Sequence, residues 1–157
     1  MKFKNYFLGL AICISCCTSP SEKRNDKKAN DSEDTNVSMI STMANTFYEH
    51  DDYSNAIKYF DKLIDRDSTN GQYYFRRGYS YARLIKKKDA IEDYKRAIKY
   101  HFKVASANYN IGLNYSYDND SLALYFFKKC IEADSSFVDA YSAIQDCEKR
   151  IKLGETR

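Results

Sequence analysis

The sequence contains little proline or glycine and no tryptophan. Its 157 residues include one proline, Pro20, and five glycines. A β-sandwich, or any fold with many tight turns, normally uses more of both residues. The same counts exclude a collagen-like chain, and five cysteines are too few for a disulfide scaffold of this length. The composition therefore predicts an all-α protein of long helices joined by short polar turns.

The sequence also lacks an apolar run long enough to cross a membrane. The run Phe7–Ile14 has eight residues, whereas a membrane-spanning helix needs about 20. Because Lys2 and Lys4 precede it, this run has the form of an export signal. The usual A-x-A cleavage site is absent, and Ser15 is followed by two adjacent cysteines. Residues 1–16 are therefore predicted to be a signal peptide.

The end of this segment resembles a bacterial lipoprotein signal, in which the chain is cut before a cysteine whose thiol carries a diacylglycerol. Ser15 suits the position before Cys16, and Ile14 is the aliphatic residue expected three before Cys17. The resemblance implies lipidation of Cys16 or Cys17, with palmitate-type acyl chains, and we favour Cys16. It places the protein in the bacterial cell envelope. With no Asp directly after the cysteine, the outer membrane is favoured over the inner. An ordinary secretory signal is the alternative.

The segment after the signal is strongly polar. Residues 18–36 hold no large apolar side chain and mix four basic with five acidic residues. Such a composition cannot bury enough surface to offset its ordering entropy. Residues 17–36 are therefore predicted to be a flexible tether. Removal of Lys2 and Lys4 with the signal would also lower the net charge of +3 to about +1.

The remainder of the chain repeats at intervals of 33 or 34 residues. Small residues, aromatics and alanines recur together, and an aromatic stands four places after each alanine. The alanines are Ala56, Ala90 and Ala123, and the aromatics that follow them are Phe60, Tyr94 and Phe127. Period-34 recurrence is typical of stacked helix–turn–helix units.

This register resembles the tetratricopeptide repeat. The repeats would span 37–70, 71–104 and 105–137, with a capping helix in 138–157 that turns Tyr141, Ile144 and Ile151 inward. The resemblance implies a right-handed α-solenoid. Two family positions differ here. The usual tryptophan is replaced by Ile40, Tyr74 and Asn108, and the usual turn proline by Ser68, Phe102 and Ser135.

In this family the first helix of each repeat lines a concave groove. The resemblance therefore predicts a groove for a peptide or another protein. Four of its residues are large, apolar and not required by the core pattern, as expected for a recognition surface. In the alternative, the short array or its tether covers them. The predicted groove residues are Asn45, Tyr48, Phe75, Tyr79, Arg83, Tyr109, Leu113 and Tyr117.

The second repeat is strongly basic. It holds ten basic and three acidic residues, a net charge of +7. This patch is either a solvated outer face or a docking surface for an acidic partner or anionic lipid headgroups. No nucleic acid is expected as a partner in the predicted compartment. The patch consists of Lys86, Lys87, Lys88, Lys95, Arg96 and Lys99.

No arrangement of residues points to catalysis, a cofactor or a metal site. His50 and His101 fall in predicted turns, and neither has a second histidine at ligand spacing. The sequence predicts that the protein is not an enzyme, with a metal-dependent accessory at His50 as a remote alternative. Cys130 and Cys147 are either buried thiols or a disulfide pair, since spacing alone does not decide between them.

These features together predict a lipid-anchored envelope protein that acts as a scaffold or assembly adaptor for another protein. The alternative is a structural spacer, or a self-associating envelope protein without a dedicated peptide ligand. The partner's identity and the oligomeric state cannot be derived from the sequence, because one repeat fold serves many functions.

Overall fold

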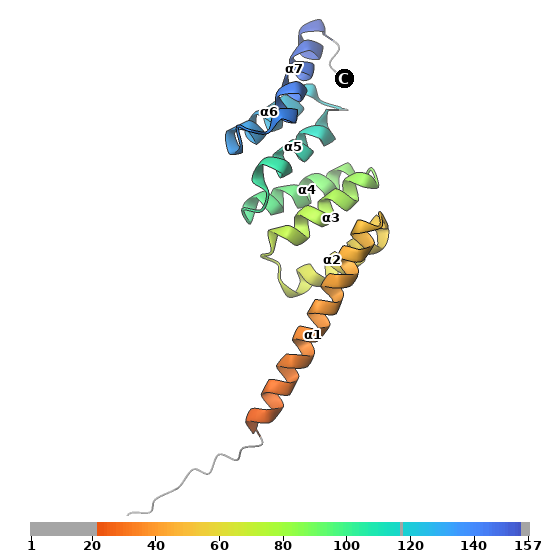
Figure 1. Cartoon of the computed structure of the whole chain (residues 1–157). Coiled ribbons are helices and arrows are strands. Elements are labelled where there is room, and N and C mark those ends of the chain that lie inside the picture. The colour runs from red at the N-terminus through yellow and green to blue at the C-terminus, as the bar shows by residue number, and fades with distance from the viewer. Residues whose placement is uncertain (1–21, 117, 155–157) are drawn as a thin grey trace, which may run out of the picture. The chain divides into compact units, whose positions relative to one another are not determined.

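Seven α-helices form the described part of the chain, residues 22–116 and 118–154 of a computed structural model (Figure 1). This confirms the predicted all-α fold. Residues 35–157 form one unit and residues 1–34 another, and the packing below concerns the first. The helices are α1 (Glu22–Glu49), α2 (Tyr53–Arg66), α3 (Gly71–Arg83), α4 (Lys87–Lys99), α5 (Val104–Tyr115), α6 (Asp120–Ala133) and α7 (Val138–Leu153).

Polar side chains fix where three of these helices begin. The carboxylate of Asp52 accepts a hydrogen bond from the backbone N–H of Asn55 at 3.2 Å, at the start of α2. Asn70 caps α3 and Asn119 caps α6 in the same way. A side-chain oxygen at this position satisfies a backbone donor that has no partner within the helix.

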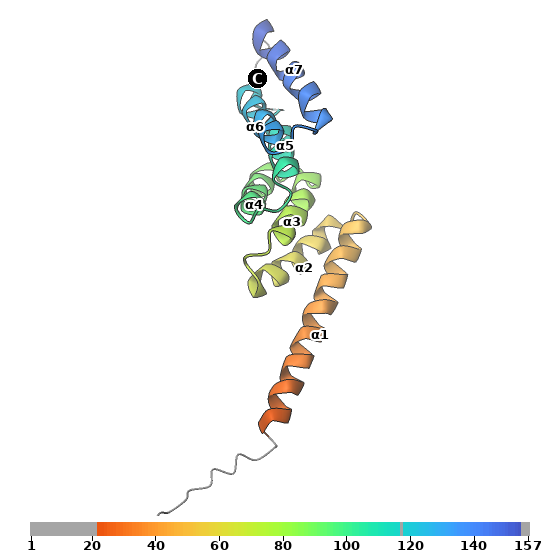
Figure 2. The same ribbon diagram turned by 60° about the vertical axis from the view of Figure 1, so that its left-hand side comes forward.

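Consecutive helices pack side by side as a stack of helix pairs. Figures 1 and 2 show α3 beside α4 and α5 beside α6, and the contacts between these elements agree. The second helix of each pair also contacts the first helix of the next, as α2 contacts α3 and α4 contacts α5. Helix α7 packs on α6 at the end of the stack, where the sequence predicts a capping helix.

The repeat register marks the places where helices approach most closely. Ala56, Ala90 and Ala123 are each 0% exposed, and the aromatic that follows each of them is buried. A Cβ atom at Gly112 would lie 2.5 Å from the ring of Phe127, closer than carbon atoms approach each other. The small residues of the register are thus required by contact between helices.

Aspartates replace proline as the organising residues of two turns between repeats. Asp67 accepts hydrogen bonds from the backbone and hydroxyl of Thr69, at 2.9 and 2.7 Å. Asp134 accepts the same pair from Ser136, at 2.9 and 2.6 Å. Such side-chain-to-backbone bonds close a turn without proline.

A tyrosine ties each of these two turns to the helix that follows. The hydroxyl of Tyr74 donates to the carbonyl of Ser68 at 3.1 Å, and that of Tyr141 donates to Ser135 at 3.1 Å. Tyr141 is 46% exposed, so the expectation that it points into the core is wrong. Its hydroxyl stays at the turn, and the buried face of α7 is formed by Ala140 and Cys147.

Helix α1 begins within the segment predicted to be a tether. Residues 22–36 are helical, whereas the sequence suggested a flexible stretch. Residues 22–36 contain neither proline nor glycine, so a polar composition does not by itself interrupt the helix. No helix in 22–116 or 118–154 combines the length and apolar character needed to span a membrane.

Candidate functional site

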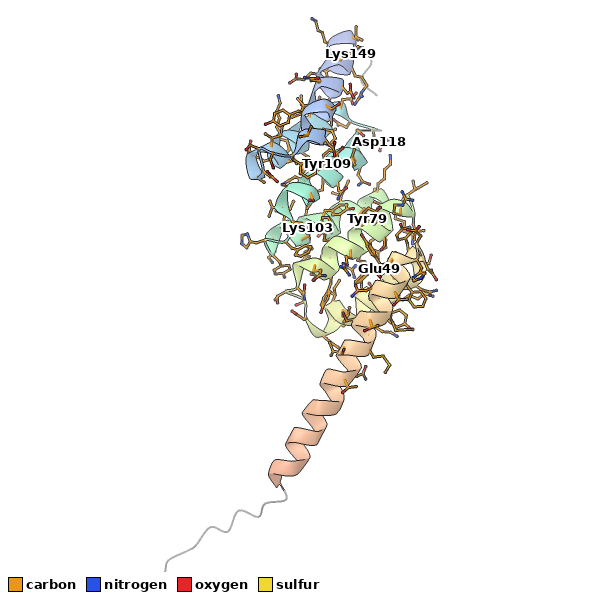
Figure 3. All side chains as sticks on the ribbon, viewed as in Figure 1. Glu49, Tyr79, Lys103, Tyr109, Asp118 and Lys149 are labelled. Atoms are coloured by element: carbon orange, nitrogen blue, oxygen red, sulfur yellow. The ribbon has the colours of Figure 1, made fainter. Side chains whose placement is uncertain are left out.

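Three predicted groove residues line one pocket between α3, α4 and α5. Tyr79 and Arg83 belong to α3 and Leu113 to α5, and the pocket has a volume of about 630 Å³. Figure 3 shows where Tyr79 lies on α3. Lys87 of the predicted basic patch also lines it, and the other described residues of the lining are Ala82, Ile85, Tyr94, Asn110 and Asn114.

Aromatic rings continue from this pocket toward the first repeat. The Tyr79 ring centroid lies 5.5 Å from that of Tyr48 and 6.0 Å from that of Tyr53. The guanidinium of Arg83 lies 5.7 Å from the centroid of the Tyr53 ring. Tyr53 was not predicted as a groove residue, because the family pattern assigns the groove to first helices and Tyr53 begins a second one.

Asn45 and Tyr48 are held in place by an arginine of the next repeat. Arg76 donates a hydrogen bond to the side-chain oxygen of Asn45, and its guanidinium lies 5.5 Å from the centroid of the Tyr48 ring. Two predicted groove residues of repeat one are therefore fixed by repeat two. A preformed surface of this kind loses less entropy when it binds a ligand.

The phenols beside the pocket remain protonated at neutral pH. The hydrogen bond that Tyr53 donates to Asp51 raises the pKa of Tyr53 to about 12, and burial adds to this effect. Burial raises the pKa of Tyr48. Hydrogen bonding to Tyr53 raises the pKa of Arg83. The surface therefore offers neutral hydroxyl groups and a permanent positive charge.

Phe75 and Tyr109 lie partly within the core. The centroid of the Phe75 ring lies 5.5 Å from that of the buried Tyr94 ring and 5.5 Å from the Lys103 Nζ atom. Tyr109 lies between Phe127 and Phe137, with centroid distances of 5.4 and 5.0 Å. The interpretation that these rings are not needed for the core is wrong, since each fills space between neighbouring helices. Leu113 remains 39% exposed.

The predicted basic patch is spread along α4 and partly paired. Lys87 forms an ion pair of 2.7 Å with Asp118, which follows α5, and Arg96 forms one of 3.4 Å with Glu92. Lys86 lies over the ring of Tyr81 and Lys99 over that of Tyr100. Lys88 and Lys95 are both exposed, and together with Lys87 they line a separate hollow of about 540 Å³.

The structure also shows a buried ionic network that the sequence analysis did not find. Arg77 on α3 donates to Asp93 on α4 through Nε and Nη2, at 2.7 Å each, and to Asp61 on α2 at 2.6 Å. Burial alone would lower the pKa of Arg77, but its hydrogen bonds and the charges of the two acids raise it overall. The network joins α2, α3 and α4, with Asp93 buried and Asp61 at the surface.

The surroundings of His50 and of the two cysteines Cys130 and Cys147 are those of structural side chains. In the part of the chain that the structure describes, no cluster of His, Cys, Asp and Glu side chains could hold a metal ion. The Nδ1 atom of His50 lies 2.8 Å from the Thr46 carbonyl oxygen. Cys130 and Cys147 are separate buried thiols. Burial raises the pKa of Cys130 to about 11.

Three predicted site residues lie outside the described residues. They are the lipidation candidates Cys16 and Cys17 and the last groove residue, Tyr117.

Comparisons with known proteins agree with the observed fold. Residues 42–69 and residues 71–101 each match the tetratricopeptide repeat family. Serine/threonine-protein phosphatase 5 from Rattus norvegicus is 28% identical over 120 residues, which is 72% of this chain and 23% of the phosphatase. The chain thus spans less than a quarter of that relative.

Solved structures of tetratricopeptide-repeat domains have a similar fold. A crystal structure of MamA protein superimposes with a TM-score of 0.70 and 26% identity, covering 83% of this chain and 72% of that one. The first TPR domain of Spaghetti (RPAP3), solved bound to the HSP90 peptide SRMEEVD, superimposes with a TM-score of 0.67 and 18% identity, covering 74% and 93%. Residues 42–69 and 71–101 are thus matched as tetratricopeptide repeats, and the described chain has an all-α fold like that of tetratricopeptide-repeat proteins.

Proposed function

We propose that this protein is a non-catalytic interaction module that binds a segment of another protein in its concave groove. The pocket of about 630 Å³ between α3, α4 and α5 carries this proposal. It joins residues from two repeats and combines exposed apolar, aromatic and cationic side chains, as recognition sites commonly do. The RPAP3 domain, which has the same fold, was solved with a bound peptide.

A pair of matched substitutions tests the groove. Leu113 on α5 is 39% exposed and lines the pocket, whereas Leu122 on α6 is 40% exposed and lies outside it. Partners are crosslinked in the cell that makes the protein and identified by mass spectrometry. Leu113→Arg is expected to reduce their recovery about tenfold or more, as loss of a central contact does. Leu122→Arg is expected to have little effect, and equal recovery with both variants would contradict the proposal.

We further propose that a lipid on Cys16 or Cys17 holds the module in the bacterial cell envelope, preferably at the outer membrane. The charged start, the short apolar run and the cysteine pair support this localisation. Labelling with a palmitate analogue, in Cys16→Ala and Cys17→Ala variants, tests it. One of the two variants should lose the label and leave the membrane fraction. A chain that carries no lipid would refute the anchor without affecting the groove.

Self-association is the second candidate function. The last helix, α7, leaves Val138 77% exposed and Leu153 59% exposed at the end of the stack. Exposed apolar side chains at the end of a repeat array can pair with another copy. Sedimentation over a range of concentrations distinguishes the two candidates, because only self-association increases the mass as the concentration rises.

A further inference from the structure

The turns inside repeats one and two have the same backbone. Asp51 has a φ of 60°, and Ile85, 34 residues later, has a φ of 61°. The N–H of each donates to the carbonyl three residues earlier, at 3.4 and 3.0 Å, and the next residue donates to the carbonyl five residues earlier, at 2.9 Å in both turns. The two turns lie along the same edge of the stack (Figure 1). Differences between them therefore belong to the side chains rather than to the fold.

The side chains on this shared backbone have opposite character. Residues 49–52 read Glu-His-Asp-Asp, whereas residues 83–86 read Arg-Leu-Ile-Lys. Leu84 is 37% exposed and Ile85 is 80% exposed. Because the same turn forms in repeat one with polar residues at these positions, the fold does not require apolar side chains there. Exposed apolar side chains that packing does not require commonly mark a contact surface.

Two residues of the repeat-two turn are also locally unfavourable. A β-branched side chain such as that of Ile85 rarely adopts a positive φ, and aspartate tolerates this region better. Asp52 caps α2 through a hydrogen bond with Asn55, but Lys86, at the equivalent position before α4, makes no capping hydrogen bond. The turn thus loses stability at both positions relative to repeat one. Contact with another molecule accounts for both residues.

Cations surround the two apolar side chains of this turn. Lys86 and Lys88 are exposed, and neither forms an ion pair with a described residue. Arg83 is exposed as well, and no acid occurs in the sequence between Arg83 and Asp89. Each lysine or arginine near an anionic bilayer adds to the attraction, and apolar side chains beside them enter the boundary between headgroups and acyl chains. The turn combines both features.

We propose that the turn of repeat two, residues 83–88, docks on an anionic lipid bilayer. Leu84 and Ile85 enter the headgroup boundary, and Lys86 and Lys88 contact lipid phosphates. A bilayer suits a projecting apolar tip because lipids rearrange around it, whereas a protein partner needs a matching pocket.

This membrane-docking surface goes beyond the proposed peptide groove. Leu84, Lys86 and Lys88 are absent from the lining of the concave pocket, so substitutions there leave that lining intact. The inference also does not require the proposed lipid anchor, although an anchor would hold the turn close to a bilayer.

A single tryptophan reports directly on the turn, because the chain contains none. In full-length Ile85→Trp, the emission is expected to shift to shorter wavelength with phosphatidylglycerol vesicles, and brominated acyl chains should quench it. Phosphatidylcholine vesicles should have little effect. Asp51→Trp, on the same backbone in repeat one, is the control and should respond to neither vesicle. Both variants contain the apolar run 7–14, but each indole reports only its own surroundings.

Loss of the cations should weaken this interaction. In the Ile85→Trp background, Lys86→Gln combined with Lys88→Gln should lower the vesicle-binding constant about 25-fold, since each lysine near an anionic surface contributes about fivefold. Lys149→Gln combined with Lys152→Gln removes the same charge from α7, where Figure 3 places Lys149. This control should change binding less than about twofold, because charges beyond a Debye length from the turn are screened.

Exchange of residues between the two turns gives an independent readout. Leu84→Trp should show the same emission shift as Ile85→Trp. Addition of Ile85→Asp and Lys86→Asp, the residues of repeat one, should abolish this shift. The melting temperature should rise at the same time, because aspartate tolerates the backbone and caps α4. An unchanged shift, or loss of the shift together with a lower melting temperature, would contradict the proposal.

The outcomes separate this inference from the proposed function. No shift in Ile85→Trp, equal shifts with both lipids, or an equal shift in Asp51→Trp would overturn the inference. A shift that appears only when a partner protein is added would also overturn it, and would assign the turn to a protein contact. Recovery of partners that depends on Leu113 would still support the groove in each of those cases. Failure of the Leu113 test would refute the groove and leave the vesicle measurements unaffected.

Discussion

The second and third repeats place side chains of opposite character at the same register positions. In repeat two the positions are Arg77 and Asp93, which form a buried ion pair at 2.7 Å. In repeat three they are Ile111, which is 0% exposed, and Phe126, which packs against the same cluster. The same helix–turn–helix geometry therefore accepts either a buried ion pair or two apolar side chains at these positions. The fold requires that the space is filled and that any buried charge is paired, not that a particular residue is present.

The contrast extends to the central aromatic of each repeat. Tyr94 and Phe127 occupy equivalent positions, and both are almost fully buried. Only Tyr94 carries a hydroxyl, and only Tyr94 lines the concave pocket. Both repeats thus use this position for packing, and the second repeat adds a buried hydroxyl group there.

Replacement of the buried acid Asp93 should have the largest effect on stability. Asp93→Asn leaves the Arg77 charge with Asp61, whose side chain is 48% exposed, as its acidic partner. Breaking one side of a buried pair costs about 3 kcal/mol or more of unfolding free energy. Asp61→Asn, the control, should cost less than about 1 kcal/mol. Urea unfolding of each variant measures the difference.

A double substitution sharpens the same comparison. Arg77→Ile combined with Asp93→Phe gives repeat two the residues of repeat three. Because both charges leave together, the double variant should be more stable than Asp93→Asn, as apolar replacement of buried ion pairs often is. A double variant less stable than Asp93→Asn would show that repeat two cannot adopt the packing of repeat three.

Addition of a side-chain carbon at Gly112, in the third repeat, should have the next largest effect on stability. In Gly112→Ala the new Cβ would meet the Phe127 ring at 2.5 Å, whereas in Gly78→Ala the nearest atom is the Cβ of Asp93 at 3.0 Å. Overpacking of a core costs about 2 kcal/mol, and the loss should be larger for Gly112→Ala. Thermal unfolding compares the variants, and Phe127→Leu should partly rescue Gly112→Ala by vacating the space.

The buried thiol of repeat three gives a pH-dependent contrast with repeat two. Cys130 stands where repeat two has Ala97, and burial raises the pKa of its thiol from 9.0 to about 11. Between these two values the folded state retains a proton that the unfolded state loses. The stabilising contribution of the buried Cys130 thiol to the free energy of unfolding is therefore fully present below pH 9 and is lost as the pH rises toward 11.

Cys130→Ala should therefore cost about 1 kcal/mol at pH 7, where the cavity term acts alone. The difference in unfolding free energy between Cys130→Ala and the unsubstituted chain should be smaller at pH 10 than at pH 7. Chemical denaturation at both pH values measures it. A gap that widened with pH would contradict a raised thiol pKa.

Tyr94→Phe should have the smallest effect on stability. Because the hydroxyl makes no hydrogen bond with a described residue, its removal should change the unfolding free energy by less than about 0.5 kcal/mol. Phe127→Tyr is the converse change in repeat three and should destabilise, since it adds a hydroxyl to a core position that is packed around a ring without one. Thermal unfolding checks both variants.

Part of the candidate site could be predicted from the sequence. The family register placed Tyr79, Arg83 and Leu113 on first helices, and the structure brings them into one pocket. Tyr94 and Asn110 could not be predicted, because the pattern assigns the first to the core and gives the second no role. Phe75 and Tyr109 were predicted to be free for ligands, but Phe75 packs against Phe102 and Tyr109 against Phe137, each at the end of the same repeat. These contacts join residues that lie far apart in the sequence, so the local pattern does not reveal them.

The scarcity of proline and glycine, together with the period of 34 residues, determined the helical class and the alanine and glycine contacts between helices. Those features are local, because each depends on residues within one helix pair. Only the tertiary structure decided that Arg77 joins three helices, that Tyr94 lines a pocket while buried and that Ile85, in the same lining, stands exposed. These properties arise where different repeats meet, and the distances between repeats follow from packing that no single segment encodes.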